Sequence, residues 1–256
     1  MIRLYTTAFE ADDAQRRREY RLSLERNLSN PFVAEVWLMV EGRVVDLPQS
    51  SKLRLRNIDR RPSYEDFFAW INDSVAPNDI SLLANADIWA DSSIGVLEKS
   101  LGPTECYAMA RWQAGRVLDR NDSQDAWAFR GRVRNVRADF AIGVPRCDNR
   151  ILYELWEAGY IVRNPSFAIR LHHEHTGARD EYGESGSNFA EPPYRYIWPH
   201  NLWTLPHTIA HNLRHRDMTI SWRFDSRRIM GIFPLRIASG LIRRSARLMS
   251  SGPDVS

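Results

Sequence analysis

The sequence predicts an α/β sandwich with a largely parallel central sheet. Two observations support this fold class. Short apolar and β-branched runs alternate with amphipathic segments in the first 160 residues, as in sheets built from strand–helix–strand units. Polar side chains also follow an apolar run directly, which is where α/β sheets bind their ligands. At 256 residues the chain suits one domain with a short appendage.

The first half of the chain supplies most of the predicted sheet. Its predicted strands are residues 2–7, 32–40, 52–57 and 80–84. A polar, Arg- and Glu-rich helix over 11–28 is indicated by Tyr20, Leu24 and Leu28, which recur every four residues. A second helix begins at Ser63, because acidic residues fill its first turn and apolar ones its inner side.

The second half is less regular. Residues 106–113 and 126–140 read as strands, although a helix also fits either segment. A helix is expected over 151–158, and residues 161–175 hold one more strand. Beyond about residue 181, Gly, Ser, Pro and aromatic residues replace any period.

Composition limits the partners and the compartment. The net charge of +3 does not require nucleic acid, and we expect no nucleic-acid partner. Two cysteines, Cys106 and Cys147, make neither a disulfide framework nor a cysteine zinc site, which fits the cytoplasm. No signal peptide and no apolar run of about 20 residues is present. We therefore expect a cytoplasmic protein.

The first chemical motif is Asn85-Ala86-Asp87, with Asp91 close behind, after the apolar run 80–84. In an extended chain Asn85, Asp87 and Asp91 have the same parity and lean toward one face. Their oxygens suit Mg²⁺ or Mn²⁺, with a diphosphate completing the metal shell. A strand-end turn explains the same residues equally well.

A second candidate is Asp148, placed just before a helix that we expect to begin near Arg150. The positive end of the helix keeps such a carboxylate ionised, as a general base requires. A plain N-cap is the competing interpretation.

Further candidates are grouped by type. His173 and His175 point to one side of a strand and suit a metal or phosphate site, while His172 is an additional candidate. Asp125 offers one more acid, and Arg61 a guanidinium for a pyrophosphate. Structural roles at loops and strand ends remain open for all of them.

The order of these features resembles the GT-A glycosyltransferases. In that family an Asp-x-Asp motif at a strand end binds the metal and the nucleotide diphosphate, and a later helix-start Asp is the base of inverting members. Here Asp87 matches the second acid of the motif and Asp148 the base. Residues 159–165, Gly-Tyr-x-x-x-x-Pro, match the run before the last strand, and His173 or His175 matches the final metal ligand.

This resemblance covers residues 1–180 and implies a GT-A-like, Rossmann-type α/β/α sandwich. It also implies that Thr6, Thr7 and Glu41 lie near the nucleotide, with Asn85 and Arg61 on the donor side. The sequence departs from the family at two positions. Asn85 replaces the first acid of the motif, and Cys147 replaces the usual Glu beside Asp148.

We expect a catalytic domain over 1–190 and a C-terminal extension over 191–256. Residues 192–205 carry aromatic side chains that suit an acceptor sugar or core packing. Residues 226–249 alternate arginines with apolar residues, which fits a helix on an anionic membrane surface as well as one docked on the core.

The sequence therefore predicts a metal-assisted glycosyltransferase. It would move a sugar from a nucleotide-sugar donor to a saccharide or lipid-linked acceptor, using Mn²⁺ or Mg²⁺ and Asp148 as an inverting base. Two alternatives remain: a metal-dependent phosphoesterase or nuclease, and a non-catalytic protein with a GT-A-like fold.

Overall fold

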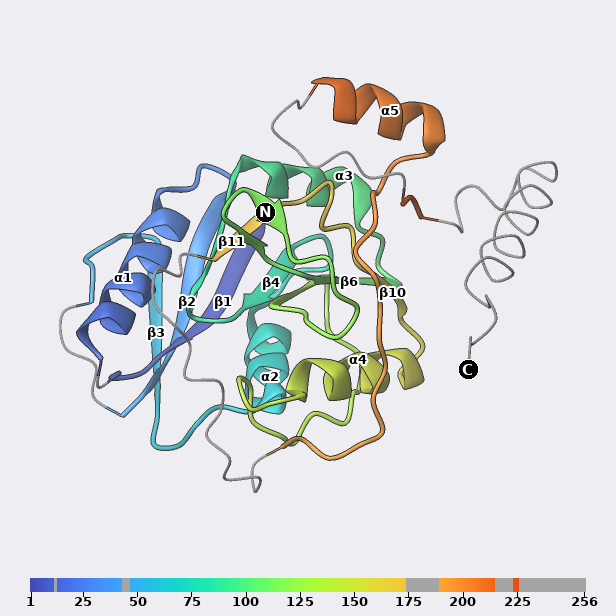
Figure 1. The fold of residues 1–256 in the computed structure, drawn as a ribbon. Coiled ribbons are helices and arrows are strands. Elements are labelled where there is room, and N and C mark those ends of the chain that lie inside the picture. Colours follow the sequence, from blue (N-terminus) through green and yellow to red (C-terminus); the bar gives the residue numbers. More distant parts are fainter. Residues whose placement is uncertain (12, 43–46, 174–188, 215–222, 226–256) are drawn as a thin grey trace, which may run out of the picture.

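The computed structural model describes all residues except 12, 43–46, 174–188, 215–222 and 226–256 (Figure 1). A seven-stranded sheet forms its centre, in the order β10-β6-β9-β4-β1-β2-β3. Its strands are β1 (Ile2–Ala8), β2 (Val33–Glu41), β3 (Leu53–Ile58), β4 (Ile80–Ala84), β6 (Glu105–Met109), β9 (Ala126–Arg130) and β10 (Ile161–Arg163). Within this described sheet β9 runs antiparallel to its two neighbours, while the other pairings are parallel. The predicted fold class, a mixed α/β fold with a mostly parallel central sheet, is confirmed.

Helices α1 (Ala14–Ser29), α2 (Tyr64–Ser74), α3 (Leu97–Ser100) and α4 (Cys147–Glu157) cover the two faces of the sheet. A 3₁₀ turn, η1 (Ser92–Val96), precedes α3, and α5 (Leu205–Arg214) follows in the C-terminal part of the chain. One buried cluster joins the sheet to α1 and α3, and a second joins its other face to α2 and α4 (Figure 1). Burying apolar area on both faces is what stabilises such a layered sheet.

Local signals explain where the helices begin. Asp13 caps α1 by accepting from the backbone nitrogen of Gln15 at 2.9 Å. The helix α2 begins at Ser63, as the sequence predicts, and Ser63 and Asp66 form a reciprocal capping box there. All five residues of β4 are buried, as expected for a central strand with both faces covered.

A second, four-stranded sheet lies beside the first. It contains β5 (Ile88–Ala90), β7 (Trp112–Gln113), β8 (Arg116–Val117) and β11 (Leu171–His173), in the order β5-β11-β7-β8. The predicted strand over 161–175 is therefore wrong as one element. It divides into β10 and β11, which belong to different sheets, because a turn at Pro165–Ile169 separates them.

Three further elements differ from prediction. The strand expected over 106–113 divides into β6 and β7, which belong to different sheets. The strand expected over 126–140 ends at Arg130, because Gly131 turns the chain with φ +70°, and a Cβ there would meet the carbonyl oxygen of Pro77 at 2.8 Å. The helix expected near Arg150 begins at Cys147, with Arg146 in the left-handed region at the N-cap. Asp148 therefore lies within the first turn and is not the N-cap.

Residues 189–203 run along the α/β body. The backbone nitrogens of Ala190, Arg195 and Ile197 donate to the carbonyl oxygens of Pro145, Asn149 and Asn121. Leu202 is fully buried in the cluster on the α1 face. This part of the expected extension is thus continuous with the core, whereas the basic segment 226–249 lies outside the described residues. None of the described helices combines the length and hydropathy needed to cross a bilayer.

Candidate active site

The topology brings two stretches of the chain to one edge of the sheet. β4 ends at Ala84, and β9, which is antiparallel to it, begins opposite at Ala126. The residues just outside this pair, Asn85 and Asp125, therefore meet. The backbone nitrogen of Asn85 donates to the carbonyl oxygen of Asp125 at 3.0 Å, and its side-chain amide reaches the Asp125 carboxylate at 3.4 Å.

Asp125 is also held by a buried arginine. Nη1 of Arg111 lies 3.0 Å and 3.3 Å from the two carboxylate oxygens of Asp125. Both side chains are about nine-tenths buried, with 12% and 8% of their surfaces exposed. Asp125, an additional candidate from the sequence, is thus the centre of a charged contact between β4, β9 and the loop after β6.

Asp87 and His173 form the second polar contact at this edge. β11 pairs antiparallel with β5, so His173 lies opposite Ile88, directly after Asp87. Nε2 of His173 is 3.0 Å from Oδ2 of Asp87, and His173 is 5% exposed. The Asp87 carboxylate is a typical ligand for Mn²⁺ or Mg²⁺, and the His173 imidazole is a common ligand of transition metals.

The 3.0 Å separation of these two atoms is that of a direct hydrogen bond, and it also matches the spacing of two adjacent ligands of an octahedral ion. Two ligands at about 2.1 Å from an octahedral ion, at right angles, lie about 3 Å from each other. No group of three or more His, Cys, Asp and Glu residues that would hold a metal occurs in the described part of the chain.

Asp91 and His172 lie in a separate cluster. His172 precedes His173 on β11, so the two imidazoles point to opposite faces. Nε2 of His172 is 3.1 Å from Oδ2 of Asp91, and its ring stacks on Trp89 at 4.1 Å. A turn from Asn85 to Ile88 interrupts the extended chain, so the alternation that would align Asp91 with Asp87 is lost. His175 falls outside the described residues.

The environment of Asp91 is that of a structural cap. Its side chain accepts from the backbone nitrogen of Ser93 at 2.8 Å, at the start of η1, and Nε of Arg170 lies 3.1 Å away. Burial raises the pKa of Asp91, but the hydrogen bonds from His172 and Ser93 outweigh it and hold the pKa below its ordinary value. These contacts account for Asp91 without a ligand.

Asp148 is held by two backbone donors. The backbone nitrogen of Gln124 donates to one of its carboxylate oxygens at 3.1 Å, and that of Asn149 donates to the other at 3.0 Å. Burial raises the pKa of Asp148 to about 6, and the negative charge of Asp125 acts in the same direction. Burial therefore outweighs the stabilisation that the two N–H donors and the helix end provide.

The surroundings of Asp148 contain two weak acids. The hydroxyl of Tyr64 donates to Sγ of Cys147 at 3.5 Å, and both residues are buried. Burial raises the pKa of Cys147 to about 11, so a thiol, unlike the Glu usual in the resembling family, adds no charge beside Asp148 at neutral pH. Beside Asp148, the Tyr64 hydroxyl and the Cys147 thiol are therefore uncharged at neutral pH. The negative charge of Asp125 adds to the effect of burial on the pKa of Asp148.

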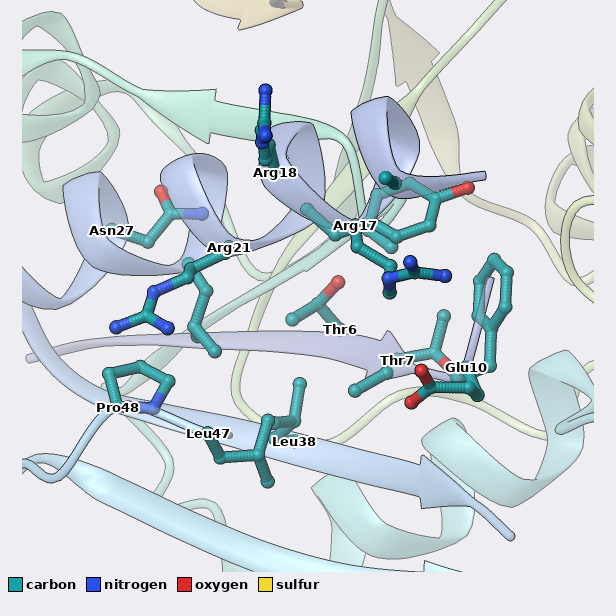
Figure 2. A pocket seen from close by; sticks show the side chains of 16 residues that line it. Thr6, Thr7, Glu10, Arg17, Arg18, Arg21, Asn27, Leu38, Leu47 and Pro48 are labelled. Atoms are coloured by element: carbon teal, nitrogen blue, oxygen red, sulfur yellow. The ribbon is translucent and has the colours of Figure 1, made fainter. Parts of the chain in front are cut away.

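A pocket of about 410 Å³ opens where β1 ends (Figure 2). Its walls are residues Thr6 to Glu10, the inner side of α1, Leu38, Leu47 and Pro48, with Ala86 at one side. Because Ala86 lies between Asn85 and Asp87, the pocket adjoins the motif at the end of β4. Figure 2 shows Thr6 and Thr7 beneath α1, facing this space.

Two threonine hydroxyls in the pocket lack an acceptor or donor among the described residues. Oγ1 of Thr6 and Oγ1 of Thr7 are buried without a hydrogen-bond partner, and Thr6 is only 5% exposed. An unsatisfied buried hydroxyl costs about 1–3 kcal/mol. A bound ligand that hydrogen-bonds to them would recover this cost.

Two donor-side candidates lie elsewhere. Glu41 ends β2, opposite Ile58, and is not among the residues that line the pocket. Arg61 is exposed before α2, with Nη2 3.5 Å from the carbonyl oxygen of Gly143. It therefore lies on the side of the loop that leads into α4.

Sequence reasoning missed Arg111, Gln124, Arg17 and Arg21. Arg17 and Arg21 line the pocket, and each precedes an inner-face residue of α1, Tyr20 or Leu24, by three positions. Residues three positions apart are neighbours on a helix surface, so this spacing indicates that Arg17 and Arg21 lie close to the inner side of α1. Arg111 and Gln124 act through contacts between distant segments, for which the sequence contains no comparable signal.

Comparisons with known proteins give structural neighbours only. No family model matches the chain, and no curated protein matches it. The mannosyltransferase PcManGT from Pyrobaculum calidifontis, solved with GDP-Man and Mn²⁺, aligns with a TM-score of 0.41 and 11% identity, covering 64% of this chain and 54% of its own. TarS of S. aureus aligns with a TM-score of 0.35 and 7% identity, covering 83% of this chain and 38% of its own. The chain spans about half the length of PcManGT and less than half the length of TarS. Both similarities concern the fold alone.

Proposed function

We propose that the protein transfers a sugar from a nucleotide-diphosphate donor to an acceptor hydroxyl. The observation that carries this proposal is the continuity of the site. The pocket reaches Ala86, its neighbour Asp87 pairs with His173, and Asn85 connects through Asp125 and Gln124 to Asp148. Donor pocket, metal ligands and base would then serve one reaction at one edge of the sheet.

The donor nucleotide would occupy the pocket at the end of β1. Leu38, Leu47 and Pro48 provide apolar surface for a base or ribose. The unsatisfied hydroxyls of Thr6 and Thr7 would hydrogen-bond to its polar edge. Asn85, beside Ala86, is a neutral polar contact for the donor, and Glu41 and Arg61 keep their proposed donor roles only at the margins of the site.

Asp87 and His173 would hold Mn²⁺ or Mg²⁺ beside the diphosphate. The bound ion would supply positive charge to the leaving nucleoside diphosphate. Nε2 of His173 donates to the Asp87 carboxylate in their 3.0 Å contact, so ion binding would replace this hydrogen bond and shift the imidazole proton to Nδ1. Asp91 and His172, which satisfy each other, would contribute indirectly by fixing the adjacent turn.

Asp148 would remove the proton from the acceptor hydroxyl. At pH 7 and above, a carboxyl group with a pKa of about 6 is mostly ionised, and it is a stronger base than an ordinary Asp. The donor N–H groups of Gln124 and Asn149 fix its direction. A base acting from the acceptor side is expected to give inversion at the anomeric carbon.

The acceptor is proposed to be a saccharide or a lipid-linked glycan. Tyr196 and Trp198 are half-exposed on the segment held against the loop before β9 and against α4. Exposed aromatic side chains suit sugar rings, and one face of the Trp198 ring is covered by the guanidinium of Arg223 at 4.7 Å. Peripheral contact with the inner face of a membrane in a cytoplasmic protein is proposed for the basic segment 226–249, which lies outside the described residues.

One assay tests the proposed function. The full-length protein is incubated with UDP-, GDP-, CDP- and dTDP-sugars and Mn²⁺, and nucleoside diphosphate release is measured. We expect release from one donor class, abolished in Asp87→Ala and Asp148→Asn and retained in Asp91→Asn. Hydrolysis of aryl phosphates or nucleic acid without sugar transfer would instead support a phosphoesterase. Absence of donor turnover, together with donor binding, would support a non-catalytic protein.

A further inference from the structure

Tyr196 lies in a segment that is fixed on both sides of it. This segment runs past α4 (Figure 1), where the backbone nitrogen of Arg195 donates to the carbonyl oxygen of Asn149 at 3.0 Å. The backbone nitrogen of Ile197 donates to the carbonyl oxygen of Asn121 at 2.9 Å. Tyr196 is therefore held between two anchored residues, one attached to α4 and the other to the loop before β9.

The same two anchors lead to Asp148. Its carboxylate accepts from the backbone nitrogen of Asn149 on one oxygen and from that of Gln124 on the other. The side-chain amide of Gln124 also donates to the carbonyl oxygen of Asn121, at 3.3 Å. Asp148 and Tyr196 therefore belong to one closed circuit of hydrogen bonds.

Two side-chain atoms of this circuit lack a hydrogen-bond partner among the described residues. They are Oε1 of Gln124 and Nδ2 of Asn149, and the two residues are only 2% and 4% exposed. The first atom is an acceptor and the second is a donor. Leaving buried polar atoms unsatisfied is costly, and one ligand hydroxyl, which both donates and accepts, would satisfy both of them.

Tyr196 adds an open aromatic ring to this polar pair. The side chain is 50% exposed, and its ring makes no aromatic or cation–π contact with the described residues. Trp198 is equally exposed, but Arg223 covers one of its faces. A sugar ring combines an apolar face of C–H groups with a rim of hydroxyls, so it suits an aromatic ring together with a buried donor and a buried acceptor.

We propose that Gln124 and Asn149 bind the acceptor hydroxyl next to the one that Asp148 deprotonates, with Tyr196 against the face of that sugar. The neighbouring hydroxyl would donate to Oε1 of Gln124 and accept from Nδ2 of Asn149. The acceptor is then a pyranoside with two adjacent hydroxyls, and not an isolated alcohol such as that of a serine or a lipid. The role of Asp148 as base rests on the proposed function; the sugar-binding contacts do not.

The first test uses the methyl glycosides of glucose, galactose, mannose and N-acetylglucosamine, without donor or metal. Their dissociation constants for the full-length protein are measured by ligand-observed NMR. We expect at least one glycoside to bind the wild type, and Tyr196→Ala to weaken its binding about threefold or more because the aromatic contact is lost. Phe189→Ala is the matched control and should change the affinity by less than about twofold. Phe189 is also 50% exposed in the same segment, but it lies outside the circuit.

Asn149→Leu tests the hydroxyl contact. The variant keeps the backbone N–H that Asp148 accepts and removes a buried donor that has no partner, so its melting temperature should be unchanged or higher. Deoxy analogues of the bound glycoside, each lacking one hydroxyl, are then compared. One analogue should bind the wild type about threefold or more weakly than its parent does, whereas Asn149→Leu should bind both equally. Gln124→Met should show the same loss of discrimination.

Three results would overturn the proposal. These are no binding of any glycoside, equal weakening in Tyr196→Ala and Phe189→Ala, or continued discrimination against the deoxy analogue in Asn149→Leu. If the glycoside binds as expected while no nucleotide sugar is consumed, the sugar site stands and the proposed function fails. If sugar is transferred to a saccharide that the Tyr196→Ala and Asn149→Leu variants bind as well as the wild type does, the proposed function stands and this site fails.

Discussion

The carboxylate of Asp148 accepts a hydrogen bond from the backbone nitrogen of Gln124 at 3.1 Å, across 24 positions of the chain. Gln124 is followed by Asp125, whose carboxylate contacts both Asn85 and Arg111. This dipeptide therefore joins the end of β4 to the first turn of α4. The candidate base and the candidate metal motif are held in one framework through Gln124 and Asp125.

The activity should fall as the pH drops through about 6. The pKa of Asp148 is raised to about 6 by burial, so the base becomes protonated below that value. We expect the rate constant kcat/KM for donor consumption to be level above pH 7 and to fall about tenfold per pH unit well below 6. A profile that stays level down to pH 4.5 would remove Asp148 from the proton transfer.

Asp148→Asn should stabilise the protein at neutral pH. The folded-state pKa lies above the ordinary value of 3.8, so the native state binds more protons than the unfolded state between about pH 4 and 6. The wild type therefore loses stability as the pH rises through this window. Urea unfolding should show Asp148→Asn more stable by about 1–3 kcal/mol at pH 7.5, with the difference shrinking toward pH 4.5. A difference that is constant with pH would contradict this account.

Arg111 should be essential for stability. Arg111→Gln leaves the buried carboxylate of Asp125 without its cation, which costs about 3–5 kcal/mol in the free energy of unfolding. Arg120→Gln is the control, because its partner Asp122 and Arg120 itself are exposed, and it should cost about 1 kcal/mol or less. Since the charge of Asp125 raises the pKa of Asp148, Arg111→Gln should also move the acid limb of the activity profile to higher pH.

The two neighbouring histidines should differ in Mn²⁺ binding. His173→Ala removes a ligand from the pair with Asp87, whereas His172→Ala removes a partner of Asp91 on the opposite face. Titration of Mn²⁺ in the presence of a nucleoside diphosphate, followed by electron paramagnetic resonance, should show about tenfold or greater weakening for His173→Ala only. Equal effects in both variants would assign the metal elsewhere.

Thr6→Val should separate ligand binding from stability. The hydroxyl of Thr6 is buried without a partner in the described residues, so replacing it by a methyl group should leave the melting temperature unchanged or higher. The affinity for a nucleoside diphosphate should fall about fivefold or more, since one neutral hydrogen bond is lost. Thr208→Val is a useful contrast, because the Thr208 hydroxyl donates to the carbonyl oxygen of Trp203 and its loss should lower stability without changing that affinity.

The sequence predicted the elements that have strong local signals. The buried apolar run of β4, the β-branched run of β2 and the Ser63 capping box each determine their element locally. It did not predict that residues 161–175 divide between two sheets. A short apolar strand has the same residue pattern whichever of the two sheets it joins. The pairings of Asp87 with His173 and of Asp91 with His172 follow from the register of β5 on β11, which is a long-range property.

The central claim is that the pocket beneath α1 and the Asp87–His173 pair bind the two ends of one ligand. A crystal structure of the protein with Mn²⁺ and the nucleoside diphosphate released in the donor assay tests it most directly. The claim predicts the base or ribose against Thr6 and Leu38, and the ion in contact with Asp87, His173 and the diphosphate. A nucleotide bound at another surface, or an ion bound by Asp91 and His172 instead, would contradict it.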